Sequence, residues 1–161
     1  MNLDVLVGDA NIFIDLEEGN LTRKFFKLPF KIIVPDILYE EELAYSHNDL
    51  LSLGLKPTSL TSNSITNLQS LTIQYPATSR NDCFALQLAK QETCPLLTGD
   101  KELRKAAEKE KVVVKGTIWI VEQLILLGLI SLKDAKNAFR EMRFKSRWLP
   151  WEEIYTQFGD F

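Results

Sequence analysis

Short apolar runs alternate with longer stretches in which apolar residues recur at helical spacing. Short runs bounded by Gly, Pro or Asp predict buried strands, and the longer periodic stretches predict helices. Strands are expected at residues 3–7, 31–34, 55–61, 95–98 and 112–114. Helices are expected from about 11 to 19, 36 to 46, 62 or 64 to 74, 81 or 82 to 92, 101 to 110, 117 to 128 and from 131 onward.

The alternation of strands and helices predicts an α/β sandwich with a mainly parallel central sheet flanked by helices. The sequence contains no internal repeat, low-complexity tract or long linker that would divide it. A chain of 161 residues can bury a hydrophobic core as a single unit. We therefore expect one domain over residues 1–161, with a core at about 3–130 and a C-terminal helix and tail at 131–161.

The composition is that of an ordinary globular protein, with 45% hydrophobic and 25% charged residues. The formal net charge of -3 gives no global basic field of the kind that nucleic-acid-binding proteins often show. A nuclease that holds metal with carboxylates nevertheless carries acids in its site and bases around it. The charge therefore leaves a nucleic-acid substrate open.

Cysteine and histidine are too few for several kinds of site. Cys83 and Cys94 form no CxxC pair, which disfavours a disulfide framework or a thiolate zinc site, so both are expected as buried free thiols. His47 is the only histidine, and no GxSxG turn accompanies it. We expect His47 at the surface, with neither a histidine metal site nor a serine hydrolase triad.

The apolar segments do not predict membrane insertion or a signal peptide. Asp4 and Asp9 interrupt the apolar stretch at residues 3–14. The most apolar segment, residues 118–130, contains Glu122 and is too short to cross a bilayer. A soluble, cytoplasmic protein without membrane contact is expected.

Two acids follow predicted strands directly. Asp9 comes after the first strand and Asp100 after the fourth, and ligands of open α/β sheets bind beyond the carboxyl ends of the strands. Either acid could instead be a helix N-cap, and Asp82 could be the acidic half of a capping box with Ser79. Carboxylates gathered in one place repel one another, and a divalent cation with a preference for oxygen ligands relieves that repulsion. We expect the three carboxylates to lie around one pocket, near enough to share a hydrated cation.

Four segments carry a family resemblance. GDANIFIDL at residues 8–16 resembles the opening motif of PIN domains, an acid at a strand tip followed by a short polar residue. NDCFALQLAK at 81–90 resembles the third motif of that family, and LLTGDKELRKAA at 96–107 resembles the fourth, a strand ending in Thr-x-Asp. VVVKGTIWIVEQLI at 112–125 is similar to the strand–Gly–Thr–helix ending of many bacterial members. Each motif is weak alone, but their order and spacing over most of residues 3–130 make the set fairly specific.

The resemblance implies a three-layer Rossmann-like PIN fold and a Mg²⁺- or Mn²⁺-dependent ribonuclease that hydrolyses single-stranded or structured RNA. Many bacterial PIN domains of this size are VapC-type toxins that a small antitoxin protein neutralises, so this chain is expected to be such a toxin or a housekeeping nuclease. Dimers are usual in the family, and the resemblance therefore implies a homodimer. It does not imply which RNA is cut, or whether one or two metal ions bind.

Positions that match the family motifs imply particular roles. Asp9, Asp82 and Asp100 become metal ligands or acids that orient the metal. The hydroxyl of Thr98 is expected to support the site, and Asn11 is expected to hold Asp9 by a hydrogen bond.

The second acid of the family falls in PDILYEEEL at residues 35–43, where three glutamates compete. A helix turns about 100° per residue, which puts Glu41 at the centre of an inward stripe and Glu40 and Glu42 on its flanks. A glutamate inside an apolar stripe is costly unless something receives its charge, so we expect Glu41 to be the second metal ligand. The residues taken to define the stripe are Ile37, Leu38, Ala44 and Tyr45.

Two basic segments are candidate RNA surfaces. The first comprises residues 136–148, which combine several cations with interleaved aromatic rings, as a phosphate-binding and base-stacking surface would. A solvated helix face whose aromatics pack on the body or on a partner subunit explains the same pattern. The second segment is the start of the helix after Asp100. The residues are Lys136, Arg140, Arg143, Phe144, Lys145, Arg147 and Trp148 in the first segment, and Lys101, Arg104 and Lys105 in the second.

Two other classes of protein compete with a nuclease. A catalytically inactive PIN-like module would bind RNA or protein through the same fold. A receiver-type signalling domain also places acids at strand tips, but it needs an adjacent acid pair after the first strand. Here Gly8 and Ala10 flank Asp9, which disfavours the receiver class.

Overall fold

A five-stranded, all-parallel sheet forms the centre of the molecule in a computed structural model that describes Met1 and residues 3–161. The strand order is β3-β2-β1-β4-β5, so the expected α/β class is confirmed, and the sheet is parallel at every pairing. The strands are β1 (Val5–Gly8), β2 (Lys31–Pro35), β3 (Lys56–Thr58), β4 (Leu96–Leu97) and β5 (Val114–Lys115).

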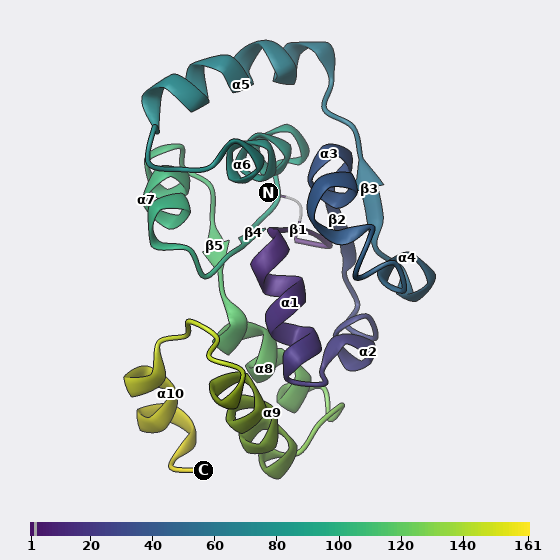
Figure 1. Ribbon diagram of the computed structural model, residues 1–161, viewed down its shortest axis with the longest axis vertical. Helices are drawn as coiled ribbons and strands as arrows, with labels where there is room; N and C mark the ends of the chain where they lie inside the picture. The colour runs from purple at the N-terminus through teal and green to yellow at the C-terminus, as the bar shows by residue number, and fades with distance from the viewer. Residues whose placement is uncertain (2) are drawn as a thin grey trace.

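Helices cover both faces of the sheet, which gives three layers (Figure 1). The helices α5, α6 and α7 lie on one side, and α1, α2, α8 and α9 lie on the other. The helices are α1 (Ala10–Glu18), α2 (Thr22–Phe25), α3 (Asp36–Leu38), the π-helix η1 (Tyr39–Leu43), α4 (Leu50–Leu53), α5 (Ser62–Gln74), α6 (Arg80–Glu92), α7 (Lys101–Lys109), α8 (Thr117–Leu126), α9 (Leu132–Phe144) and α10 (Trp151–Phe158).

The strand order reverses direction between β1 and β4, which are neighbours although most of the chain's first hundred residues separate them. Their register pairs Val7 with Leu96 and Gly8 with Leu97, so both strands end at the same level. The backbone N–H of Asp9 continues this pairing by donating to the carbonyl of Leu97 at 3.1 Å. Such a switch point in an open α/β sheet is where ligands bind.

Close packing at the end of β1 sets the path of the chain into α1. A Cβ added at Gly8 would lie 2.6 Å from the ring of Phe13, a separation that side chains essentially never show. Phe13 is itself buried in the core beside Ile12 and Leu16. Glycine is therefore required at the strand tip, and it lets α1 begin immediately at the edge of the sheet.

Several expected elements differ from the observed ones. The helix expected over residues 36–46 is a single turn followed by a π-helix that ends at Leu43. Thr61 caps α5, where Ser62 or Ser64 was expected. The short helices α2, α4 and α10 were not expected. The helix expected from 131 onward is α9, and Ser131 and Asp134 form a capping box at its start. None of the helices in the described part of the chain is long and apolar enough to span a membrane.

Candidate active site

Asp9 is the N-cap of α1 and is almost completely buried, with 1% of its surface exposed. Its Oδ1 accepts a hydrogen bond from the backbone N–H of Ile12 at 3.0 Å, and its Oδ2 accepts one from the hydroxyl of Thr98. Burial raises the pKa of Asp9 to about 7. The hydrogen bonds from Thr98 and Ile12 lower this pKa, while the charges of Asp82 and Asp15 raise it. A buried carboxylate under this electrostatic load is ready to accept a cation.

Thr98 joins Asp9 to Asp100. While its hydroxyl donates to Asp9, its Oγ1 accepts a hydrogen bond from the backbone N–H of Asp100 at 3.0 Å. Asp100 is the N-cap of α7, and its Oδ1 accepts from the backbone N–H of Leu103 at 2.7 Å. The supporting role expected of Thr98 is observed as these two hydrogen bonds. The expected alternative is also observed, because Asp9 and Asp100 both cap helices.

Asp82 lies in the first turn of α6, which Ser79 caps by accepting from the backbone N–H of Asp82 at 3.1 Å. The pKa of Asp82 is raised to about 6, mainly by burial; the Ser79 hydrogen bond lowers it, and the charges of Asp100 and Glu42 contribute to raising it. Asp82 therefore lies within electrostatic reach of both strand-tip acids. The three acids expected to come together lie on the same side of the fold, although they come from three separate helix starts.

The argument that selected Glu41 is wrong. The backbone N–H of Ala44 donates to the carbonyl of Tyr39, five residues back, so the chain here follows a π-helix and not the assumed α-helix. The expected stripe is lost, and Tyr45 is 100% exposed. Glu41 itself has 47% of its side chain exposed and lies 3.7 Å from Arg80. The inward residues of this segment are Leu38, Tyr39 and Leu43.

Asn81 connects the glutamates to the third acid. Its Nδ2 donates to Oε2 of Glu41 and to Oε2 of Glu42, each at 3.0 Å. Of the two, it is Glu42 whose charge raises the pKa of Asp82. Glu40, on the other flank, is exposed. The π-helix therefore presents Glu42 to the acid cluster and Glu41 to Arg80.

The donor set suits a hard divalent cation. Carboxylate oxygens are the ligands that Mg²⁺ and Mn²⁺ prefer, and Asp9 and Asp82 carry raised pKa values that a cation would reverse. The Oδ1 of Asn81, the residue before Asp82, is buried and has no hydrogen-bond partner in the described part of the chain, so it remains able to accept a hydrogen bond. Among Met1 and residues 3–161, no three His, Cys, Asp or Glu side chains stand close enough to hold a metal ion between them, so the expected sharing of one cation by Asp9, Asp82 and Asp100 stays a prediction.

The hydrogen bond expected from Asn11 to Asp9 is not the one observed. The Oδ1 of Asn11 accepts from Nη2 of Arg147 at 3.2 Å. The same arginine forms an ion pair through Nε with Oδ1 of Asp15 at 2.5 Å, and Asp15 is buried on α1. Burial raises the pKa of Asp15, and the hydrogen bond and charge of Arg147 lower it. The sequence analysis missed Asp15, although an acid within the apolar run of residues 12–16 was a usable signal.

The remaining candidates are placed as follows. Arg104 donates through Nη2 to the backbone carbonyl of Thr98 at 3.5 Å, which holds its guanidinium beside the strand tip. Cys83 and Cys94 are buried free thiols, as expected. His47 lies only partly exposed at the surface, with 17% of its side chain accessible, and its Nδ1 pairs with Glu17.

Comparison with known proteins identifies one family. The family model DUF3368, a PIN domain, matches residues 5–158. The match includes the strand tips and the starts of α6 and α7, where Asp9, Asp82 and Asp100 lie. No curated protein matches the chain.

Proposed function

The chain is a member of the PIN-domain family, and on that premise we propose that it is a Mg²⁺- or Mn²⁺-dependent endoribonuclease. PIN domains have a nuclease-type fold and typically use divalent metal ions. The proposed acids are Asp9, Asp82 and Asp100, with Glu42 in place of the Glu41 that helical phase suggested.

One observation carries the proposal. The charge of Asp82 raises the pKa of Asp9, and the charge of Asp100 raises the pKa of Asp82, so the three acids act on one another across the switch point of the sheet. Burial already disfavours the charged forms of Asp9 and Asp82. Maintaining such a cluster costs stability unless a cation is bound there, and this cost is typical of a functional site.

Each residue has a defined task in this proposal. A bound divalent ion supplies a polarised water and neutralises charge on the scissile phosphodiester. Asp9, Asp82 and Asp100 would hold the ion, and Thr98 keeps the carboxylate of Asp9 oriented through its hydroxyl. Arg104, held at the carbonyl of Thr98, supplies positive charge for the RNA phosphate beside the acids.

The test is cleavage of a mixed RNA pool by the purified protein with Mg²⁺ or Mn²⁺, with EDTA and with the Asp100→Asn variant. We expect metal-dependent cleavage by the wild type that both EDTA and the substitution abolish. Equal cleavage by wild type and variant would identify a contaminating nuclease. No cleavage by either protein over several metals and RNAs would reject the enzyme and favour an inactive PIN-like module that binds RNA or protein.

We further propose that the protein is the toxin of a toxin–antitoxin pair and acts as a homodimer that a small antitoxin inhibits. The length of the chain and its motifs resemble those of VapC-type toxins, and this resemblance supports the role. Induced expression should arrest growth, and co-expression of the adjacent small reading frame should restore it. Growth arrest by the Asp100→Asn variant would show that toxicity does not come from RNA cleavage.

A further inference from the structure

Trp148 lies in the connection between α9 and α10 and is 95% exposed. Tryptophan is a large, mostly apolar side chain that usually buries most of its surface. Phe144, at the end of α9, is also exposed, at 81%. The indole therefore offers nearly its whole ring to something outside this chain.

The backbone that carries Trp148 is held firmly. Three successive backbone N–H groups, at residues 145, 146 and 147, donate back to carbonyls of α9, with a distance of 3.0 Å in each case. Ser146 adopts a φ of 57°, a left-handed conformation that turns the chain off the helix. Leu149 then packs against the core. Trp148 thus stands between fixed neighbours, so a ligand that stacks on it would not have to order the loop first.

Arg147 fastens this connection to the helix that begins the active site. Its guanidinium bonds to Asp15 at 2.5 Å and to Asn11 at 3.2 Å, and these two residues lie one turn apart on α1. Asn11 is two residues beyond Asp9. Trp148 is therefore next in sequence to a side chain that contacts the first two turns of the helix capped by Asp9.

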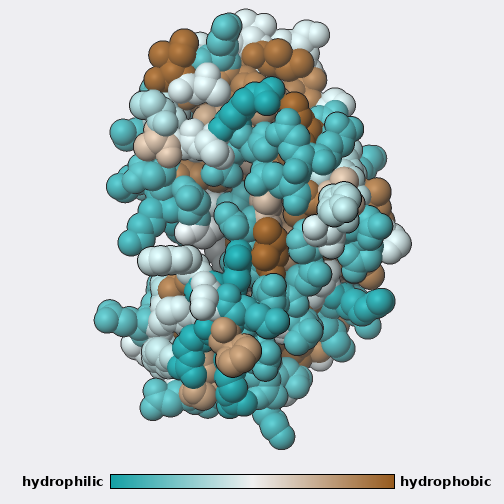
Figure 2. Space-filling view, in the orientation of Figure 1, coloured by the Kyte–Doolittle hydropathy of each residue, from teal (hydrophilic) through white to brown (hydrophobic). Residues whose placement is uncertain are grey.

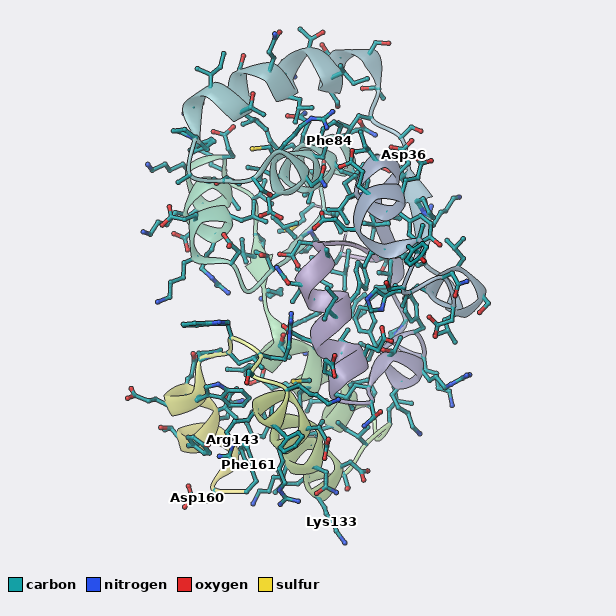
Figure 3. The ribbon with its side chains drawn as sticks, viewed as in Figure 1. Asp36, Phe84, Lys133, Arg143, Asp160 and Phe161 are labelled. Atoms are coloured by element: carbon teal, nitrogen blue, oxygen red, sulfur yellow. The ribbon has the colours of Figure 1, made fainter. Side chains whose placement is uncertain are left out.

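The surroundings favour an anionic occupant over an apolar one. The face seen in Figure 2 is hollowed between the α6–α7 side of the molecule and the α9–α10 side, and most of the side chains bordering the hollow are hydrophilic. Lys145, three residues before the indole, lies 3.8 Å from Glu18, and Lys101 and Arg104 follow Asp100 on the α7 side. Arg143 is used elsewhere, since its guanidinium lies 5.1 Å from the ring of Phe161 against α10 (Figure 3). Proteins that bind single-stranded nucleic acid combine exposed aromatic rings, on which bases stack, with basic residues along the path of the strand.

We propose that Trp148 is a stacking platform for an unpaired base of an RNA strand whose phosphodiester lies at the Asp9–Asp82–Asp100 site. The inference rests on the proposed function for the identity of the strand. Stacking on an aromatic side chain requires a base that is not paired, so the platform selects single-stranded RNA over duplex RNA. The position of Trp148, fixed relative to α1 through Arg147, then determines which phosphodiester meets the acids.

The test is equilibrium binding, measured by anisotropy of a short fluorescein-labelled single-stranded RNA in EDTA, so that cleavage does not enter. We expect Trp148→Ala to weaken binding by roughly tenfold or more, in line with about 1–3 kcal/mol for each stacked base. Trp148→Phe should retain most of the affinity because it keeps an aromatic face. Phe144→Ala is the matched control, an exposed aromatic in the same region whose loss should change affinity by less than about threefold. The same RNA annealed to its complement should bind wild type and Trp148→Ala alike.

The outcomes separate this proposal from the ribonuclease proposal. Loss of single-strand affinity in Trp148→Ala supports the platform even if the wild type cuts no RNA. Unchanged affinity in Trp148→Ala overturns it, even if cleavage is robust. If Trp148→Ala instead converts a dimer to a monomer in light scattering while RNA affinity is unchanged, the indole is a subunit contact and the proposal is wrong.

Discussion

The strand tips and the η1 turn hold their acids in different ways. Asp9 and Asp100 follow neighbouring strands in fixed register, each caps a helix, and Thr98 bonds to both residues. The glutamates at residues 40–42 are exposed on a single π-helical turn. Asn81 bonds to two of them, and Arg80 pairs with Glu41.

Strand register and helix caps position most of the strand-tip acids' contacts, with Thr98 as the one bridging side chain, whereas side-chain contacts alone position the glutamates of η1. A cap fixes its carboxylate to within a hydrogen bond of the helix, whatever the rest of the fold does. An exposed glutamate keeps three side-chain torsions free and adopts the geometry that its partners impose. The strand-tip acids should therefore tolerate no change of chemistry, while the glutamates should differ from one another only in degree.

The largest expected effect is that of Asp100→Asn, which removes the negative charge of one strand-tip acid. Asparagine is as good an N-cap as aspartate, so α7 should keep its start and the free energy of unfolding should change by less than about 1 kcal/mol. RNA cleavage should fall by at least roughly 10³-fold, because one anionic ligand of the proposed ion is lost. Initial cleavage rates and thermal unfolding together measure both effects. Glu102→Gln, in the first turn of the same helix and exposed, is the control, and equal rates in the two variants would contradict the assignment.

The next largest effect is the pH dependence of the free energy of unfolding without metal. It tests how strongly burial destabilises the charged form of Asp9. Asp9 has an ordinary pKa of 3.8 and a folded pKa of about 7, so between these values the folded state retains a proton that the unfolded state has released. The free energy of unfolding should therefore fall as pH rises from about 4 to 7, by about 2–4 kcal/mol. Asp9→Asn should remove most of this loss, and millimolar Mg²⁺ should reverse it in the wild type by binding the folded state.

Asp134 provides a comparison of opposite sign for this experiment. Hydrogen bonds from the backbone and side chain of Ser131 hold the pKa of Asp134 below its ordinary value. Its contribution to stability is present at neutral pH and is lost as pH falls through the folded pKa. The difference in the free energy of unfolding between wild type and Asp134→Asn should therefore grow as pH rises. If denaturant titrations gave wild type and Asp9→Asn the same dependence of the free energy of unfolding on pH, the pKa of Asp9 would not be raised in the folded state.

A smaller effect is expected at the π-helix, where each glutamate is exposed and can be substituted separately. Glu42→Gln should lower the cleavage rate by about tenfold, equivalent to about 1.4 kcal/mol of transition-state stabilisation. Glu41→Gln and Glu40→Gln should stay within about threefold of wild type. The three variants differ by one position each and form their own control series. A dead Glu41→Gln beside an active Glu42→Gln would restore the assignment that helical phase favoured.

The smallest expected effect is that of Thr98→Val, which removes a hydrogen bond to Asp9 but leaves all the acids in place. Loss of the hydroxyl should cost about 1 kcal/mol of stability and leave the Asp9 carboxylate without the hydrogen bond that Thr98 donates to it. Because that hydrogen bond lowers the pKa of Asp9, its loss raises the pKa, and the rising limb of the pH–rate profile should move to higher pH. Thr98→Ser keeps the hydroxyl and should behave as wild type. A profile that Thr98→Val leaves unmoved would mean that Asp9 need not ionise for cleavage.

Local signals explain why the strand tips could be predicted from the sequence. An apolar run followed by Gly8 and Asp9 marks both the end of a strand and the start of a helix, and the same holds where β4 gives way to Asp100. The parallel alternation of elements then places the two tips at one edge of the sheet. Nothing beyond short-range pattern and fold class was needed for this part of the site.

The parts that could not be predicted depend on geometry or on partners distant in the chain. The π-helix at Tyr39–Leu43 breaks the assumption of 100° per residue, so the expected inward stripe, and with it the argument from helical phase for Glu41, failed. The partner of Asp15 is 132 residues away, and no local pattern announces it. Helices as short as α2 and α4, of four residues each, span too little of a helical period to leave a signal.

The pair formed by Asp15 and Arg147 also bears on how the protein is made. Synthesis proceeds from the N-terminus, so Asp15 leaves the ribosome long before the arginine 132 residues later that neutralises it. Until then, burial of the Asp15 carboxylate on α1 would cost several kcal/mol of free energy, because its charge would have no partner. The helix that presents Asp9 is therefore expected to dock late, and the nascent chain would lack the completed arrangement of acids until residue 147 has been translated.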